Sequence, residues 1–241
     1  MIIDQLTLRQ RLTWLAHLWK ACTKQHHKEL APLFARYLPE GAVVFDVGAH
    51  SGQFAKLFSG LTPKGRVFSF EPGSYARSIL GYAVKFNGKK NVTIEPYGLG
   101  SQSASFVLNV PVKKSGSLGF GLSFVGDASA AGRPVISETV TIRTIDEVVQ
   151  EHGLNRLDFI KADIEGFELE MLNGAHQTLK TLRPTVYVEV VDDHLRRAGG
   201  SADELFQLMT DLQYHQANLT TGEILPPGQQ EHGDLLFVPE G

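Results

Sequence analysis

From Gly41 onward, apolar runs of strand length alternate with segments of helical length, and this alternation restricts the fold more than any other feature. The runs are rich in β-branched and aromatic residues on both faces, as in parallel strands that are covered by helices on both sides. Strands and helices that alternate in this way predict a doubly wound α/β fold with a mostly parallel, seven-stranded, Rossmann-like sheet and an antiparallel last strand. The predicted strands are 42–47, 65–72, 91–98, 157–162, 185–190, 214–220 and 233–239, and the predicted helices between them are 53–59, 74–87, 165–182 and 201–212.

The chain is expected to contain one such domain, residues 41–241, preceded by a helical extension, residues 1–40. In the extension, apolar positions recur at helical spacing over 6–22, and a second helix is predicted over about 26–37. The first helix is amphipathic and basic. It is expected to pack on the domain or on the second copy of a homodimer, and weak association with a membrane surface is the alternative.

An insertion interrupts the domain at about 101–143. Strand-like segments at 103–110 and 137–144 flank a Gly- and Ser-rich stretch, which predicts a β-hairpin with a long loop. Loops of this length are either lids over a binding site or surface excursions, and apolar residues in the stretch favour a lid.

Charge and cysteine content exclude several classes of protein. The net charge of −3 and the isoelectric point near 6.3 do not provide the basic surface that a nucleic-acid-binding protein needs. The single Cys22 cannot form an internal disulfide, which is typical of a reducing compartment. The sequence has neither a secretory leader pattern at its start nor an apolar run long enough to span a membrane. We therefore expect a cytoplasmic protein.

Candidate binding residues lie where predicted strands end. In "VVFDVGAHSGQF", Val43 to Phe54, an apolar run leads into Asp46, Gly48, His50 and Gly52. The next strands end in Glu71 and in Asp163 with Glu165. Doubly wound sheets bind ligands beyond the carboxyl ends of their strands, so these side chains are expected to lie together.

The spacing of the first glycines indicates which ligand is bound. Dinucleotide sites use GxGxxG, whereas this chain has DxGxxxG, with Asp46 placed to repel a phosphate. A carboxylate there favours a ligand that carries positive charge, and Glu71 is placed to accept the two hydroxyls of a ribose. The pattern therefore favours S-adenosylmethionine over a nicotinamide cofactor.

The same segments carry a family resemblance. "FDVGAHSGQF", "VFSFEP", "RTIDEV", "LDFIKADIEGFELEMLNGA" and "PTVYVEV", in this order, resemble the FkbM family of S-adenosylmethionine-dependent methyltransferases over about residues 41–190. Members of that family are O-methyltransferases that act on sugars and polyketide-type natural products. The resemblance implies a small-molecule hydroxyl acceptor, and it leaves the acceptor's identity open. It also implies residue roles: Asp46, Gly48, Ala49 and Gly52 would line the methionine part of the cofactor, with His50 in the same turn, Glu71 would hold the ribose, and Asp163 would face the methyl group.

Methyl transfer to a hydroxyl needs alignment and a base that takes the proton. Asp163 is the first candidate for that base, followed by Glu165, His50 and His194. His50 is the weaker choice, because a histidine within a glycine turn can serve by its backbone alone.

Alternatives remain for these and neighbouring residues. Glu165 and Glu168 are predicted in the first turn of a helix, where carboxylates favour the helix dipole, and His194 is predicted in a loop. Asp163, Glu189 and Asp192 could instead bind a divalent cation through their oxygen atoms, an alternative that is possible but not favoured. The alternative functions are a non-catalytic cofactor-binding module of the same fold and, less favoured, a nicotinamide-dependent oxidoreductase.

Overall fold

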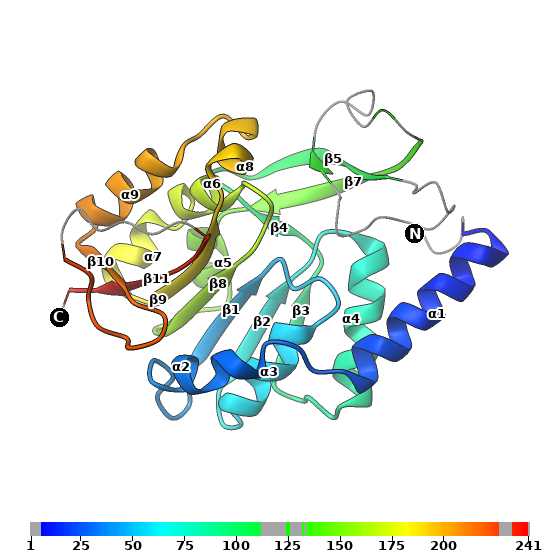
Figure 1. The fold of residues 1–241 in the computed structure, drawn as a ribbon, viewed down its shortest axis with the longest axis horizontal. Coiled ribbons are helices and arrows are strands. Elements are labelled where there is room, and N and C mark those ends of the chain that lie inside the picture. The colour runs from blue at the N-terminus through cyan, green and yellow to red at the C-terminus, as the bar shows by residue number, and fades with distance from the viewer. Residues whose placement is uncertain (1–5, 112–123, 126–131, 133, 227–232, 241) are drawn as a thin grey trace.

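The computed structural model describes residues 6–111, 124–125, 132, 134–226 and 233–240. It contains a seven-stranded sheet with the strand order β10-β11-β9-β8-β1-β2-β3 (Figure 1). All neighbours in this sheet pair in parallel except β11, which is antiparallel to both β9 and β10. The strands are β1 (Val43–Val47), β2 (Arg66–Phe70), β3 (Val92–Glu95), β8 (Phe159–Ala162), β9 (Thr185–Val190), β10 (Tyr214–Ala217) and β11 (Gly233–Pro239). The predicted doubly wound sheet with one antiparallel strand is confirmed.

Helices cover both faces of this sheet, and each face has its own apolar core. One face packs against helices of the C-terminal half, and the other packs against helices that lie earlier in the chain. The first group is α5 (Ile145–Glu151), α6 (Glu168–Asn173), α7 (His176–Thr181) and α9 (Ala202–Asp211), and the second is α2 (Ala31–Ala35), α3 (Gln53–Leu61) and α4 (Ser74–Phe86). Because β1 is buried along its whole length, its polar Asp46 must find partners inside the protein.

A second sheet, with the order β4-β7-β5-β6, stands beside the first at the top of Figure 1. Its strands are β4 (Gly98–Leu99), β5 (Ala104–Pro111), β6 (Phe124–Val125) and β7 (Val135–Arg143). The predicted antiparallel pairing of the insertion's strands is present, because β5 pairs with β7 from Ala104↔Ile142 to Pro111↔Val135. Most of the Gly- and Ser-rich stretch that is predicted to act as a lid lies outside the described residues.

The predicted third strand, 91–98, is divided in the structure. β3 ends at Glu95 and β4 begins at Gly98, in the other sheet. Pro96 separates them, and proline lacks the N–H group that would continue the sheet's hydrogen bonds.

The predicted single helix 165–182 is also wrong, because the structure has a loop followed by α6 and α7. The break falls at Gly174, where a Cβ atom would lie 2.0 Å from the carbonyl oxygen of Gly100. Asp146, at the start of α5, accepts hydrogen bonds from the N–H groups of Gln177 and Thr178 and so stabilises the start of α7. A tertiary contact and a cap from another helix therefore interrupt a continuous helical pattern.

The N-terminal helix α1 (Leu8–Thr23) packs along α4 and begins with a capping box between Thr7 and Gln10 (Figure 1). The second predicted helix is shorter than expected. A 3-10 turn, η2 (Lys28–Leu30), follows His27 in the left-handed region and leads into α2. Of the helices in the described ranges, none is long and apolar enough to span a membrane.

Candidate active site

The turn between β1 and α3 is fixed by backbone contacts with the ends of two neighbouring strands. The N–H groups of Gly48 and Ala49 donate to the carbonyl of Phe70 at the end of β2, at 3.1 and 3.0 Å. Gly48 has a φ of +72°, and a Cβ atom there would lie 2.1 Å from the carbonyl oxygen of Asp163, at the end of β8. Only glycine tolerates both the left-handed backbone and this approach. The predicted glycine loop therefore lies directly against the predicted base.

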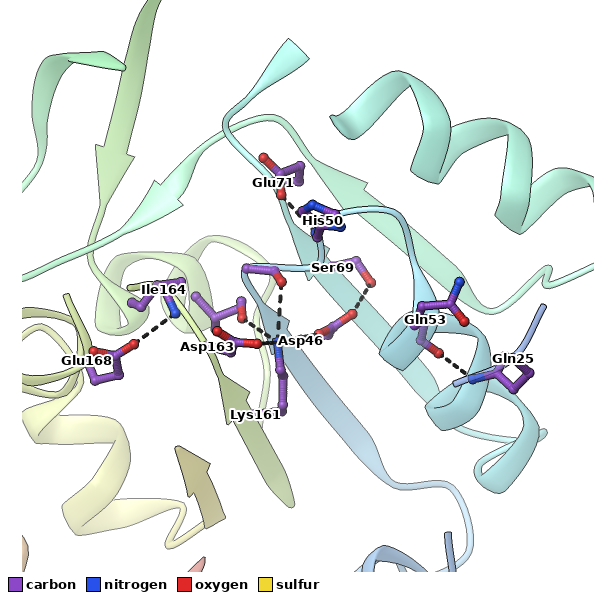
Figure 2. A network of polar contacts seen from close by, with 12 residues as sticks. Gln25, Asp46, His50, Gln53, Ser69, Glu71, Lys161, Asp163, Ile164 and Glu168 are labelled. Carbon is purple, nitrogen blue, oxygen red and sulfur yellow. Dashed lines mark hydrogen bonds and ion pairs between the residues drawn. The ribbon is translucent and has the colours of Figure 1, made fainter. Parts of the chain in front are cut away.

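Glu71 joins this turn to the loop after β2. Its carboxylate accepts the backbone N–H of His50 at 2.8 Å (Figure 2) and the backbone N–H of Gly73, also at 2.8 Å. Burial raises the pKa of Glu71 to about 7, although the N–H groups of Gly73 and His50 favour the charged form. One carboxylate thus sets the relative position of two loops at the carboxyl edge of the sheet.

His50 contributes its backbone to this arrangement, and its ring is partly buried. Its φ is +50°, its N–H donates to Glu71, and its Nδ1 lies 3.3 Å from the Ser51 hydroxyl oxygen. Burial, followed by the charge of Lys161, lowers the pKa of His50 to about 4. The imidazole is consequently neutral at pH 7 and is a weaker proton acceptor than an ordinary histidine.

Lys161, which sequence reasoning did not assign to the site, is buried at its centre. Only 1% of its surface is exposed. Its Nζ donates to the carbonyls of Val47 and Gly48 at 3.2 and 3.3 Å. The same ammonium lies 3.8 Å from Oδ1 of Asp46 and 3.9 Å from Oδ2 of Asp163 (Figure 2). Lys161 therefore connects the strand that carries the glycine turn to the predicted base.

Asp46 lies beneath the glycine turn, fully buried. Its carboxylate accepts a hydrogen bond from Ser69 at 3.4 Å and faces Lys161, whereas its Oδ1 atom has no hydrogen-bond partner in the described part of the chain. Burial raises the pKa of Asp46 to about 6, and Lys161 and Ser69 act in the opposite direction. Asp46 was predicted to line the methionine part of the cofactor, and the structure places its side chain in an internal ion pair.

The loop after β8 carries Asp163 and Glu165, whose side chains are 49% and 55% exposed. Glu165 is not in a helix, contrary to the prediction, because its φ is +57° and α6 begins at Glu168. A Cβ atom at the next residue, Gly166, would lie 2.4 Å from the carbonyl oxygen of His194, so this loop is held tightly against the segment after β9.

Glu168 lies in the first turn of a helix, as predicted, and its carboxylate has a further role in the loop before that helix. It is the first residue of α6, and its buried carboxylate accepts the N–H group of Ile164 at 2.8 Å (Figure 2) and that of Gly166 at 2.9 Å. Burial raises the pKa of Glu168 to about 7. Its carboxylate therefore shapes the loop that presents Asp163, beyond any effect on the helix dipole.

His194 lies in a helix, α8 (Asp192–Arg197), and not in the predicted loop. Its Nδ1 is 3.6 Å from Oε2 of Glu165. In the same helix Asp192 pairs with Arg196 at 2.5 Å and accepts the N–H of Ala202 at 2.9 Å. Both carboxylate oxygens of Asp192 thus have partners within the protein, and these contacts give no support to the alternative in which Asp192 helps to bind a divalent cation.

Further carboxylates extend the site along β9 and β11. Glu189 of β9 pairs in register with Asp234 of β11. Burial raises the pKa of Glu189, and the neighbouring charges of Asp163, Asp234 and Glu165 raise it further. Among the described residues, no group of three or more His, Cys, Asp and Glu side chains is arranged to hold a metal ion. The carboxyl edge of the sheet therefore carries an acidic rim, Glu71, Asp163, Glu165, Glu189 and Asp234.

The structure thus brings most predicted residues together. Gly48 contacts Asp163, His50 contacts Glu71, and Lys161 lies between Asp46 and Asp163. Ala49 is buried in the same turn, and Gly52 is the N-cap of α3 with a φ of +86°. Lys161 could have been found from the sequence, because a lysine in the middle of a strand that is buried on both faces must have a charged or carbonyl partner.

Comparison with known proteins gives the family. The Methyltransferase FkbM domain matches residues 46–215, which include the glycine turn and the loop after β8 and end at the start of β10. This chain belongs to the FkbM methyltransferase family. The assignment confirms the family resemblance that was drawn from the motifs, and it makes the chain a methyltransferase by family and fold.

Curated proteins that resemble this chain are distant from it in sequence. The 2-O-methyltransferase NoeI of Sinorhizobium fredii is 26% identical over 79% of this chain and 79% of its own length. The hexuronic acid methyltransferase AglP of Haloferax volcanii is 27% identical over 72% of this chain and 66% of its own length. A much longer relative, the AMB antimetabolite synthetase AmbE of Pseudomonas aeruginosa, is 25% identical over 71% of this chain, which spans only 9% of that protein.

A solved structure supports the fold. The FkbM methyltransferase of Methylobacillus flagellatus superimposes with a TM-score of 0.51 at 14% identity, covering 92% of this chain and 58% of the other. At this level of identity the similarity concerns the arrangement of helices and strands.

Proposed function

We propose that the chain transfers the methyl group of S-adenosylmethionine to a hydroxyl group of a small molecule. The observation that supports this most is the juxtaposition of the glycine turn with Asp163, at the carboxyl edge of the sheet and beside an acidic rim. This edge lies at the point where the strand order reverses around β1, the usual ligand site of doubly wound sheets.

The charges of the rim suit this cofactor. S-adenosylmethionine supplies an electrophilic methyl group on a sulfonium, and its amino group is also positive. The carboxylates of the rim outnumber Lys161, whose charge is already shared with Asp46 and Asp163. An acidic site attracts such a cation and repels the pyrophosphate of a nicotinamide dinucleotide. The charge pattern therefore favours methyl transfer over the oxidoreductase alternative.

The residues of the edge divide the binding among them. The turn from Gly48 to Gly52, with Ala49 and His50, would contact the methionine part. Glu71 would accept ribose hydroxyls, because each of its oxygens takes one backbone N–H and keeps lone pairs for a further donor. Asp46 would not contact the cofactor directly, and it would support the glycine turn through its ion pair with Lys161.

Asp163 is the base that we assign to the reaction. When bound, S-adenosylmethionine would supply the methyl group to the acceptor oxygen and leave as S-adenosylhomocysteine, and the carboxylate of Asp163 would accept the proton that the acceptor hydroxyl loses. The carboxylate is half exposed, so it can reach an acceptor, and Lys161 at 3.9 Å restrains its orientation. Glu165 and His50 are second choices, since Glu165 faces His194 and the ring of His50 is a weak base.

The acceptor class is inferred from relatives and charge. NoeI is named a 2-O-methyltransferase and AglP a hexuronic acid methyltransferase, which supports a hydroxyl of a sugar or a related small molecule. The net charge of −3 does not favour a nucleic-acid acceptor. The reaction as drawn requires no metal ion, so EDTA is expected to leave turnover unchanged.

Isothermal titration calorimetry with S-adenosylmethionine, S-adenosylhomocysteine and NADH tests the cofactor directly. We expect the two sulfur compounds to bind and NADH not to bind. Absence of binding of both sulfur compounds at about 1 mM, where binding free energies are only about 4 kcal/mol, would refute the proposal. Tight cofactor binding without transfer to any of a panel of sugar and polyketide hydroxyls would instead favour the non-catalytic module.

The role of Asp163 is tested by Asp163→Asn. This variant is expected to bind S-adenosylhomocysteine as the wild type does and to lose about 100-fold or more in turnover. Glu165→Gln serves as the matched control, because it removes a neighbouring charge from the same loop. Full turnover in Asp163→Asn, or a larger loss in Glu165→Gln, would transfer the assignment to another residue.

A further inference from the structure

Helix α1 has two apolar faces, and within the described part of the chain other residues of the protein cover one of them and leave the second exposed. Leu8, Leu12, Leu15 and Trp19 are 77%, 60%, 52% and 69% exposed. They are separated by four, three and four positions, so they share one face of the helix. We call these four residues the outer face of α1. Their regular spacing on one face points to a partner that covers them.

The opposite face of α1 is firmly attached to the protein. Ala21 of α1 packs in one core cluster with Tyr75 and Ile79 of α4, and Trp14 donates from Nε1 to the Ser78 hydroxyl at 2.9 Å. These contacts lie on α4, which runs beside α1 in Figure 1.

The C-terminal end of α1 is fixed by a buried lysine from α3. Nζ of Lys56 donates to the carbonyls of Ala21 and Lys24 at 2.6 and 2.7 Å. Because backbone carbonyls are unsatisfied at the end of a helix, this ammonium is a suitable cap. The outer face is therefore held in position before any partner arrives, which reduces the ordering cost of binding.

The charge around the outer face has one sign. α1 contains Arg9, Arg11 and Lys20, all exposed, and no acidic residue. At about 100° per residue, Arg9 and Lys20 fall on one border of the outer face and Arg11 falls on the other. Beyond the helix, Lys24 and Lys28 follow, and Glu29 is the single acid between residues 6 and 38. An apolar stripe bordered by cations on both sides is complementary to an apolar surface that carries negative charge.

We propose that the outer face of α1 binds the surface of an anionic lipid membrane. Leu8, Leu12 and Leu15 would enter the boundary between headgroups and acyl chains, and Trp19 would lie at the level of the headgroups. Arg9, Arg11 and Lys20 would contact lipid phosphates. The α4 side of the helix stays attached to the protein, so the enzyme would sit on the surface without crossing it.

A second copy of the chain fits this face less well. A helix of 16 residues is about 24 Å long and about 10 Å wide, so its outer face covers on the order of 240 Å². Stable protein interfaces cover about 800 Å² on each partner. Two outer faces would also bring six cations together without an acid on either helix to pair with them.

Co-sedimentation of the full chain with lipid vesicles tests the proposal. We expect binding to vesicles with about one third anionic lipid and at least about tenfold weaker binding to neutral phosphatidylcholine vesicles. Binding is expected to weaken as NaCl is raised from about 0.05 to about 0.5 M, because the Debye length falls. Equal binding to both vesicle types, or none to the anionic ones, overturns the proposal.

Matched variants locate the contact. Leu12→Gln with Leu15→Gln is expected to weaken binding at least about tenfold, because it removes two apolar side chains from the outer face. Val107→Gln with Ile224→Gln changes two other exposed apolar residues, 48% and 55% exposed, and is expected to bind as the wild type does. Equal effects of the two pairs would overturn the assignment to α1.

Charge variants and oligomeric state complete the test. Each of Arg9→Gln, Arg11→Gln and Lys20→Gln is expected to weaken anionic vesicle binding about fivefold, and none is expected to change binding of S-adenosylhomocysteine. If size-exclusion chromatography gives a dimer that Leu12→Gln with Leu15→Gln converts to a monomer, and vesicles retain no protein, the face binds a second copy and the proposal is wrong. Vesicle binding needs no cofactor, so its failure is distinct from a failure of the proposed methyl transfer.

Discussion

Replacing Lys161 by methionine is expected to destabilise the fold strongly and in a pH-dependent way. Methionine keeps the apolar stem of the side chain and removes the ammonium that bonds to the carbonyls of Val47 and Gly48 and faces Asp46. Since Asp46 is fully buried, the variant leaves a carboxylate inside the protein without a counter-charge. Breaking a buried ion pair from one side costs about 3–5 kcal/mol, so we expect a loss of that size in the free energy of unfolding at pH 8.

The pH dependence follows from the titration of Asp46. Its pKa is raised by burial from the ordinary 3.8 to about 6. The native state therefore binds more protons than the unfolded chain between these values, and stability falls as pH rises from about 4 to about 6. A shift of roughly two pKa units corresponds to about 3 kcal/mol of unfolding free energy, and the native protein has lost this amount once Asp46 is ionised at neutral pH. At pH 5 the carboxyl group of Asp46 is largely protonated in the wild type and in Lys161→Met. The variant is therefore expected to lose only about 1–2 kcal/mol of unfolding free energy at this pH, because it lacks the hydrogen bonds to the carbonyls of Val47 and Gly48.

Urea unfolding, followed by circular dichroism at pH 5 and pH 8, measures both losses. Lys64→Met is the control, because Lys64 is 75% exposed in a surface pair with Glu40 and should cost less than about 1 kcal/mol. Adding Asp46→Asn to Lys161→Met removes the unpaired charge and is expected to recover part of the loss at pH 8. The same loss at pH 5 and pH 8, or no recovery in the double variant, would refute the assignment of the ion pair.

Two further predictions concern the loops of the site. Gly48→Ala is expected to lose cofactor binding and more than about 3 kcal/mol of stability, because the backbone has a φ of +72° and the new Cβ would clash with the carbonyl oxygen of Asp163. Gly153→Ala is the control. Its backbone has a φ of +57° but nothing lies within 4 Å of the new Cβ, so it should cost about 1 kcal/mol. Similar losses in the two variants, measured by urea unfolding, would contradict the close contact. The pKa of Glu168 is raised to about 7 from 4.5, so its protonated form stabilises the native state and stability falls as pH rises through about 7. Glu168→Gln should therefore have a melting temperature that falls less between pH 5 and pH 8 than that of the wild type, and an equally steep fall would show that Glu168 does not titrate in this range.

The alternation of strands and helices was sufficient to predict the main sheet, because each strand is apolar on both faces and only a helix-covered parallel sheet satisfies such strands. The prediction was wrong where tertiary contacts act on the backbone. Gly174 ends a helical pattern because the backbone of Gly100 lies against it. Helix α8 was missed because only one of its residues, Leu195, is buried, so it has no apolar period to detect.

The site was predictable to the extent that strand ends define it. Asp46, Gly48, Glu71 and Asp163 come together because parallel strands end at one edge of the sheet. Side-chain direction was not predictable in the same way. Asp46 points into the protein because Lys161 lies on the adjacent strand, 114 residues beyond Val47 in the chain, and no local pattern connects the two.

The register of the second sheet has a consequence for protein engineering. Ala104 and Ile142 are paired neighbours, so the segment between them leaves and re-enters the fold at one point. Asp46 on β1, Glu71 after β2 and Asp163 after β8 all lie outside this segment. Residues 104–142 could therefore be exchanged for the corresponding segment of another family member, because the two junctions, at Ala104 and Ile142, lie side by side in the sheet. Chimeras of this kind would keep the main sheet and its glycine turn and change only this segment, so that the effect of the segment on acceptor choice could be measured.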